Sequence, residues 1–235
     1  MIAADQPTIF GKSIIAAISS KKDGNMKFDI DGSKVTENRQ KFLRGVGIDM
    51  QHTSLVGVTY DTDNFAKYNV ATVEDKGNGM LDARAVRHAD ALVVDQPGHA
   101  LFLLLADCVG AILYDDGHHV LMMSHLGRHS VEIDGAAKSV RYLVRHYSTN
   151  PSRLQVWLSP GVGKATYPLR AFGGKSLHEV ITMQLLSVGV QTDNIENGGI
   201  DTAHNEQYYS HSQYLKGDET QRGRFAIVAQ MREAE

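Results

Sequence analysis

The 235-residue chain contains one cysteine, Cys108, so it cannot form a disulfide bond within itself. It also lacks an excess of basic residues, because 24 Lys and Arg face 27 Asp and Glu and give a formal net charge of −3. This balance provides neither the basic surface of a nucleic-acid-binding protein nor a polybasic membrane patch. A single cysteine fits a reducing compartment.

Long hydrophobic runs are absent too, and no stretch reaches the roughly 18 apolar residues of a membrane-spanning helix. The first 20 residues hold a short apolar run that is not preceded by a basic N-terminal region, so they do not show the pattern of a secretory signal peptide. We find no internal repeat, low-complexity tract or dividing linker. The sequence therefore predicts a single domain over residues 1–235, in a cytoplasmic, monomeric protein that binds neither membranes nor nucleic acid.

Hydrophobic periodicity predicts strands and helices that alternate along the chain. The expected strands are 12–18, 26–30, 53–60, 91–95, 100–106, 154–158 and 225–231. The expected helices are 33–44, 131–147 and 176–188, and residues 61–80 form a long surface segment. This interleaving is typical of the α/β class, and we expect a layered α/β sandwich around a mixed β-sheet.

Cys108 and His125 fall in a predicted β-hairpin. Asp116-Gly117 is typical of a two-residue turn, because a type I′ turn requires positive φ at both positions. With that turn, Cys108 lies directly opposite His125, with Cβ atoms about 4.5–5.5 Å apart. Such a pair suits a shared metal ion or a thiolate–imidazolium contact. A buried cysteine beside a hydrogen-bonded histidine is also an ordinary core arrangement.

Several stretches resemble, in matching order, the bacterial laccase-domain family, which is also called the polyphenol-oxidase-like or purine nucleoside phosphorylase family. DALVVDQPG, LADC and SHLG resemble its DALVTDQPG strand, its TADC strand and the start of its AHAGWRG turn. VTENRQ, MQHTSLVGV and SPGVGKATY resemble its ENR helix, QVH strand and GPAIGPCCYEV loop. YYSHSQ and QRGRFAIVAQM resemble its C-terminal FFSYRRDG and TGRMA segments, so the similarity covers nearly the whole chain.

This resemblance implies a zinc enzyme that acts on purine nucleosides. The family's metal ligands fall on His52, Cys108 and His125, which are therefore also the expected catalytic residues. Three protein ligands leave a fourth tetrahedral position for water or substrate, as a catalytic zinc requires. Copper is the alternative metal. The implied partners are a nucleoside and phosphate, and the implied reactions are phosphorolysis of adenosine or inosine and deamination of adenosine.

Arg128, His129 and Tyr167 are the residues that we expect to bind substrate and phosphate. Arg128 and His129 directly precede the predicted helix 131–147, and a helix N-terminus beside an arginine favours a bound anion. Tyr167 comes from the SPGVGKATY loop and would form one side of the pocket for the purine base. The family's WRG is replaced by RHS, so its tryptophan is absent. The match is therefore closer at the metal ligands than at the substrate positions.

Two further pairs are candidates for the site. His88 and His99 flank predicted strands near Cys108, and the binding clefts of open α/β sheets lie at strand ends. Arg222 and Arg224 match the family's TGR segment and would close over the cleft, although arginines are also common on ordinary surfaces.

Two other classes of function use the same residues. In a Cys–His enzyme of acyl chemistry, Cys108 would be a nucleophile activated by His125. The fold class is similar to that of the catalytic domain of cytotoxic necrotizing factors, and an amidase that acts on a cell-wall precursor peptide belongs to the same alternative. In a non-catalytic, metal-dependent binding protein, the same residues would hold a metal without turnover. A multicopper oxidase is excluded, because none of the eleven histidines lie two residues apart in His-X-His pairs.

Overall fold

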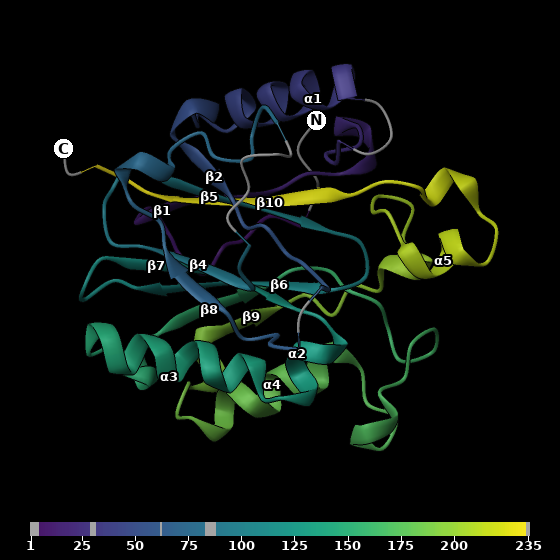
Figure 1. Ribbon diagram of the computed structural model, residues 1–235. Coiled ribbons are helices and arrows are strands. Elements are labelled where there is room, and N and C mark those ends of the chain that lie inside the picture. The colour runs from purple at the N-terminus through teal and green to yellow at the C-terminus, as the bar shows by residue number, and fades with distance from the viewer. Residues whose placement is uncertain (1–4, 29–31, 62, 83–87, 234–235) are drawn as a thin grey trace.

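The computed structural model describes residues 5–28, 32–61, 63–82 and 88–233. Figure 1 shows a layered molecule in which two β-sheets lie face to face between helices. Helix α1 (Gly32–Gly45) covers the outer face of one sheet, and helices α3 (Gly135–Tyr147) and α4 (Leu177–Ser187) cover the other. The predicted α/β class and the layered arrangement are confirmed, and the layers contain two mixed sheets where we expected one.

The first sheet has four strands in the order β1-β10-β5-β2. They are β1 (Ile14–Ile18), β10 (Phe225–Met231), β5 (Ala100–Leu105) and β2 (Thr53–Leu55). Strand β10 pairs antiparallel with both β1 and β5, whereas β2 runs parallel to β5. On the outer face, Phe42 and Leu43 of α1 are buried in one cluster with Phe102 and Val228.

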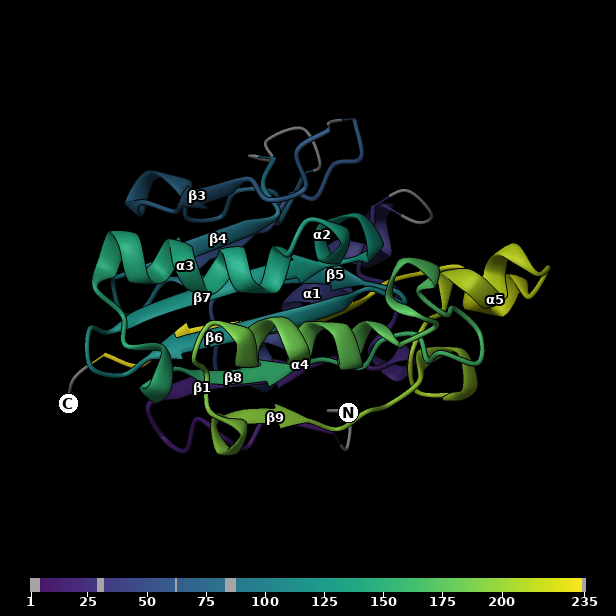
Figure 2. The same cartoon turned by 90° about the horizontal axis from the view of Figure 1, so that it is seen from below.

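The second sheet has six strands in the order β3-β4-β7-β6-β8-β9. They are β3 (Tyr68–Val70), β4 (Ala91–Val94), β7 (Val120–Leu126), β6 (Val109–Asp115), β8 (Gln155–Leu158) and β9 (Ile195–Asn197). Every residue of β4, β6 and β7 is buried, because the first sheet covers one face and α3 and α4 cover the other (Figure 2). Strands buried on both faces require nearly continuous apolar runs, as seen in ALVV and VLMM.

Three predicted elements before residue 81 differ from the structure. Residues 26–28 of the expected strand 26–30 form no strand, since Met26 bonds instead to Arg224 and Arg39, and the remainder lies outside the described residues. The expected strand 53–60 ends at Leu55. The expected surface segment 61–80 contains β3, which pairs parallel with β4.

The expected helix 131–147 is divided into α2 (Arg128–Glu132) and α3. Asp134 separates them in a left-handed conformation with φ 61°. The break brings residue 135 against Ser130. Only glycine fits there, because a Cβ on residue 135 would collide with the Ser130 side chain. A further short helix, α5 (His211–Leu215), precedes β10. Within the described part of the chain, no helix is long and apolar enough to cross a membrane.

The predicted register of the β6–β7 hairpin was wrong. The connection is a four-residue loop over 116–119, and Gly110, not Cys108, pairs with His125. Positive φ occurs at His119 rather than at the expected turn positions. The Asp115 carboxylate explains the longer loop, because it accepts hydrogen bonds from the backbone N–H groups of residues 117 and 118 and from a ring nitrogen of His118.

Candidate functional site

A cavity of about 760 Å³ opens where β5 ends and β6 and β10 begin. This volume lies within the range of sites for small organic ligands. Its walls come from segments far apart in sequence, namely the ends of β2, β5 and β7, the residue before β10, and α5. The polar side chains on these walls are Lys27, Arg39, Tyr60, His88, Asp90, Asp107, Cys108, His125, Arg128, His129, Ser130, Tyr167, His211, Ser212 and Arg224.

The crossover between the two sheets places Cys108 in this cavity. Residues 106–108 connect β5 of the first sheet to β6 of the second. Asp107 turns the chain with φ 81°, a conformation that is uncommon for residues other than glycine. Its buried carboxylate accepts hydrogen bonds from the Thr202 hydroxyl at 2.7 Å and from the Ser212 backbone N–H. These bonds fix the crossover to the C-terminal part of the chain.

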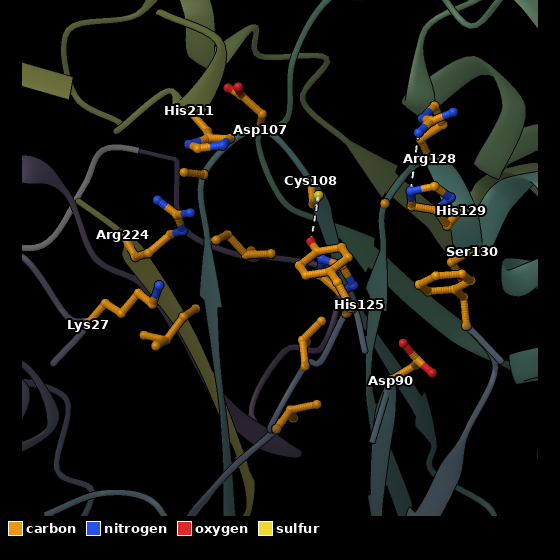
Figure 3. A pocket seen from close by; sticks show the side chains of 18 of the residues that line it. Lys27, Asp90, Asp107, Cys108, His125, Arg128, His129, Ser130, His211 and Arg224 are labelled. Carbon is orange, nitrogen blue, oxygen red and sulfur yellow. Dashed lines mark hydrogen bonds between the residues drawn. The ribbon is translucent and has the colours of Figure 1, made fainter. Parts of the chain in front are cut away.

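Cys108 and His125 converge at Gly127, although they are not paired across the hairpin. A Cβ built on Gly127 would lie 2.9 Å from Cys108 Sγ and 3.2 Å from His125 Cε1. A backbone hydrogen bond positions His125, since its N–H donates to the Asp90 carbonyl at 2.8 Å. Figure 3 shows both side chains in the centre of the pocket. The structure thus brings together two of the three predicted metal ligands.

The third side chain at this point is Tyr60, which was not among the residues predicted from the sequence. Its hydroxyl lies 4.0 Å from Cys108 Sγ, the contact drawn as a dashed line from the sulfur in Figure 3. Its ring meets the His125 ring edge to face, with centroids 6.4 Å apart and planes at 85°. Tyr60 follows β2 by five residues, and no motif in the sequence marks it.

His52 does not reach the other predicted ligands. It lies in a 3₁₀ turn, Met50–His52, directly before β2, and it is exposed. Since β2 runs parallel to β5 with Thr53 opposite Ala100, His52 lies level with the start of β5, whereas Cys108 follows its end. The residues of the described chain contain no group of three His, Cys, Asp or Glu that could hold a metal ion. The side chains present therefore do not fit the three-ligand zinc site that the resemblance implies.

The electrostatic environment keeps Cys108 and His125 neutral. Burial raises the pKa of the Cys108 thiol to about 11. Burial, with a smaller effect from Arg224, lowers the pKa of His125 to about 4. An activated cysteine requires the opposite shifts, with the thiolate stabilised beside a protonated imidazole. This arrangement disfavours the interpretation of Cys108 as an amidase nucleophile.

Basic side chains lie on both sides of the central pair. Arg224, Lys27 and His211 lie on one side in Figure 3, and Arg128 and His129 lie on the other. Arg224 is half-buried, and its Nη1 donates to the Gly223 carbonyl. Of the two arginines in the matched TGR segment, Arg224 lines the cavity and Arg222 does not.

The three predicted substrate contacts, Arg128, His129 and Tyr167, all line the cavity. The His129 ring stacks on Phe65 with centroids 4.6 Å apart and planes at 18°. The Arg128 guanidinium is 3.1 Å from the His129 ring and 3.7 Å from the Glu132 carboxylate. The start of the expected helix 131–147 falls in α2, whose first three residues line the cavity, whereas the N-terminus of α3 does not.

Histidines 88 and 99 have different positions. His88 lines the cavity, and its Nδ1 lies 3.2 Å from the Gly57 carbonyl. His99 is buried at the start of β5, where its Nε2 lies 2.7 Å from the Ser54 hydroxyl. His99 is therefore part of the core rather than of the cavity.

Comparison with curated proteins finds two purine nucleoside phosphorylases. The chain is 33% identical over 99 residues to one from Corynebacterium glutamicum, covering 42% of this chain and 39% of that protein. It is 28% identical over 132 residues to one from Streptomyces griseus, covering 56% of this chain and 50% of that protein. The matches thus span half or less of the length of these relatives.

Comparison with solved structures supports the fold. YlmD from Geobacillus stearothermophilus superposes with a TM-score of 0.86 over 99% of this chain and 98% of that chain, at 20% identity. A family model described as multi-copper polyphenol oxidoreductase laccase matches residues 19–172 and 173–232. Since these two segments include most of the sequence, the chain belongs to this laccase-domain family.

Proposed function

We propose that the chain binds a purine nucleoside and phosphate in this cavity and cleaves the glycosidic bond by phosphorolysis. Two curated relatives carry the name purine nucleoside phosphorylase. Those matches span half or less of the relatives, so the chemistry of this chain's own cavity has to support the proposal.

The charge of the cavity is the observation that carries the proposal. Among the described residues, lysine or arginine lines the cavity at four positions, Lys27, Arg39, Arg128 and Arg224, and a carboxylate at two, Asp90 and Asp107, in a protein of net charge −3. Both carboxylates are engaged, since Asp90 accepts from the Lys67 N–H at 2.9 Å and Asp107 holds the crossover. A concentration of positive charge in a partly closed site suits an anionic ligand such as phosphate.

Phosphate fits best beside Arg224. Lys27 and His211 line the same side of the cavity, so three nitrogen-bearing side chains meet there (Figure 3). Arg128 is a weaker anchor, because its side chain is 45% exposed and lies near the Glu132 carboxylate. We assign the phosphate to the Arg224 side and the nucleoside to the side of Arg128 and His129.

The base has an aromatic wall on the second side. Phe65 and His129 form a stacked pair, and Tyr60 and Tyr167 also line the cavity. Aromatic faces bind purines by stacking, at about 1–3 kcal/mol for each base. The cavity volume of about 760 Å³ is sufficient for a nucleoside and phosphate together.

These positions suit the chemistry of phosphorolysis. A phosphate oxygen attacks C1′ of the ribose, the C–N bond breaks, and the base leaves with the bonding electrons and takes up a proton. The products are the free base and ribose 1-phosphate. The part of the protein in this step is to hold the two reactants in line and to offset the phosphate charge with Arg224.

The test is release of free base from inosine and adenosine by the purified protein, followed by chromatography with and without phosphate. We expect base and ribose 1-phosphate only when phosphate is present. Conversion of adenosine to inosine without phosphate would instead support deamination. If no purine nucleoside is changed under either condition, the proposal is wrong, and a binding protein or an amidase becomes the better interpretation.

A further inference from the structure

We propose that Tyr60 occupies the third ligand position of the metal site implied by the family resemblance, and that the chain therefore does not bind zinc at Cys108 and His125. This inference goes beyond the proposed function. It concerns which group completes the centre of the cavity, whatever reaction takes place there.

The first support is the convergence of three side chains. Cys108 Sγ and His125 Cε1 both lie within 3.2 Å of one point beside Gly127. The Tyr60 hydroxyl lies 4.0 Å from the same sulfur, and its ring lies edge to face with the imidazole. Tyr60 is thus the third side chain at this point, and a third metal ligand would have to take its place.

The second support is that neighbouring donors are used elsewhere. The Asp107 carboxylate is occupied by Thr202 and Ser212, and the Asp90 carboxylate accepts from the Lys67 N–H. His52 lies at the opposite end of β5. Within the described segments, no His, Cys, Asp or Glu completes a group of three.

The third support is the chemistry of the donor set. Catalytic zinc sites use three protein ligands drawn from thiolate, imidazole and carboxylate. A phenol is protonated near neutral pH and offers the metal only a neutral oxygen. Two ligands and a phenol are therefore a poor site for zinc, whereas a thiol, an imidazole and a phenol can hydrogen-bond to one another.

Tyr60→His provides a gain-of-function test, because it replaces the phenol with the missing imidazole. Wild-type protein and variant are incubated with zinc, dialysed against zinc-free buffer and analysed for bound metal. We expect well under one zinc per chain in the wild type and close to one in Tyr60→His. With cobalt(II), a thiolate-to-cobalt charge-transfer band should appear in the variant alone.

Two control variants separate ligation from a change in packing. Tyr60→Phe keeps the ring without the hydroxyl and should remain metal-free. Adding Cys108→Ser to Tyr60→His should remove both the bound zinc and the cobalt–thiolate band. Circular dichroism and thermal unfolding establish that each variant is folded before its metal content is compared.

Two outcomes would overturn the inference. One is a wild-type chain that retains one zinc and loses it on Cys108→Ser. The other is a folded Tyr60→His protein that binds no more zinc than the wild type, because Tyr60 would then not stand at a ligand position. These measurements use no nucleoside, so their result is independent of whether phosphorolysis is found.

Discussion

Gly110 lies opposite His125 across the β6–β7 hairpin, and Cys108 lies two residues earlier, in the crossover between the sheets. A Cβ on Gly110 would lie 2.6 Å from Ile227 Cδ1 and 2.9 Å from Leu105 Cδ1, so side chains of the facing sheet pack directly on this glycine. Cys108 therefore reaches His125 past Gly127 at the end of the strands, and not across the hairpin.

Gly127→Ala should disturb the centre of the cavity. The backbone there, with φ −91° and ψ −179°, accepts alanine, so the effect comes from the added methyl, 2.9 Å from Cys108 Sγ. We expect a loss of about 1–3 kcal/mol in the free energy of unfolding, measured by urea denaturation, together with weaker nucleoside turnover.

Gly45→Ala is the matched control for that change. Gly45 ends α1, and a Cβ there would have no neighbour within 4 Å. Because alanine favours a helix more than glycine does, this variant should be as stable as the wild type or slightly more stable. Equal effects of the two substitutions would show that Gly127 is not tightly enclosed.

Arg224→Ala should weaken phosphate binding. Loss of a charge-assisted hydrogen bond of about 1.5–3 kcal/mol corresponds to a rise in the KM for phosphate of about 10- to 150-fold. Arg222→Ala, two residues away and outside the cavity, should leave that KM unchanged. The measurement is the initial rate of base release against phosphate concentration.

The opposite result for the two arginine variants would place the phosphate at the other wall of the cavity. If Arg128→Ala raises the KM for phosphate and Arg224→Ala does not, the phosphate lies beside Arg128 and His129, as the sequence alone predicted.

Asp107→Ala should destabilise the crossover. It removes the acceptor for the Thr202 hydroxyl and the Ser212 N–H, and it places alanine at φ 81°. We expect a loss of about 2–4 kcal/mol in unfolding free energy. Asp107→Asn should lose less, because asparagine tolerates this conformation and keeps one acceptor oxygen.

Hydrogen exchange can locate the effect of the Asp107 variants. Faster exchange over residues 202–212 in Asp107→Ala, with less change in Asp107→Asn, is the expected result. Equal stability of both variants and the wild type would mean that the carboxylate does not hold the crossover.

The free energy of unfolding should decrease as the pH is lowered, because of His99. Burial lowers the pKa of His99 to about 4, whereas an unfolded histidine titrates near about 6.5. Between these values the unfolded chain binds the proton and the folded chain does not, so stability is lost as pH falls from about 6.5 to about 4. His99 should contribute a loss of about 2 kcal/mol between pH 7 and pH 5.

His99→Gln tests this contribution, since glutamine stays uncharged and can still bond to the Ser54 hydroxyl. The difference in unfolding free energy between pH 7 and pH 5 should be smaller than in the wild type. His146→Gln, which changes an exposed side chain of α3, should leave the wild-type difference intact. An identical pH dependence in all three proteins would contradict the prediction.

The arrangement of layers could be predicted because it depends on local pattern. ALVV, ALFLLL and FAIVAQM are apolar runs too short for long helices, and such runs become strands covered on both faces. The amphipathic segment after residue 130 likewise predicted a covering helix, although Gly135 divides it.

The candidate site was only partly predictable. The motifs identified Cys108, His125, Arg128 and His129 as neighbours, and all four line one cavity. His52 was expected with them because it follows a glutamine in a QVH-like stretch, but His52 precedes β2, whereas the cavity is lined by the residues at and after the end of β2.

The sequence by itself determined the α/β layers and the proximity of the only cysteine to His125, because both follow from local hydrophobic pattern and short motifs. The tertiary structure alone decided that Tyr60 is the third side chain beside Cys108 and His125, and that Arg224 lines the same cavity. Those contacts depend on a four-residue loop, on the left-handed turn at Asp107 and on the packing of two sheets. A shift of two residues in one register changes which side chains meet, and no local pattern determines such a shift.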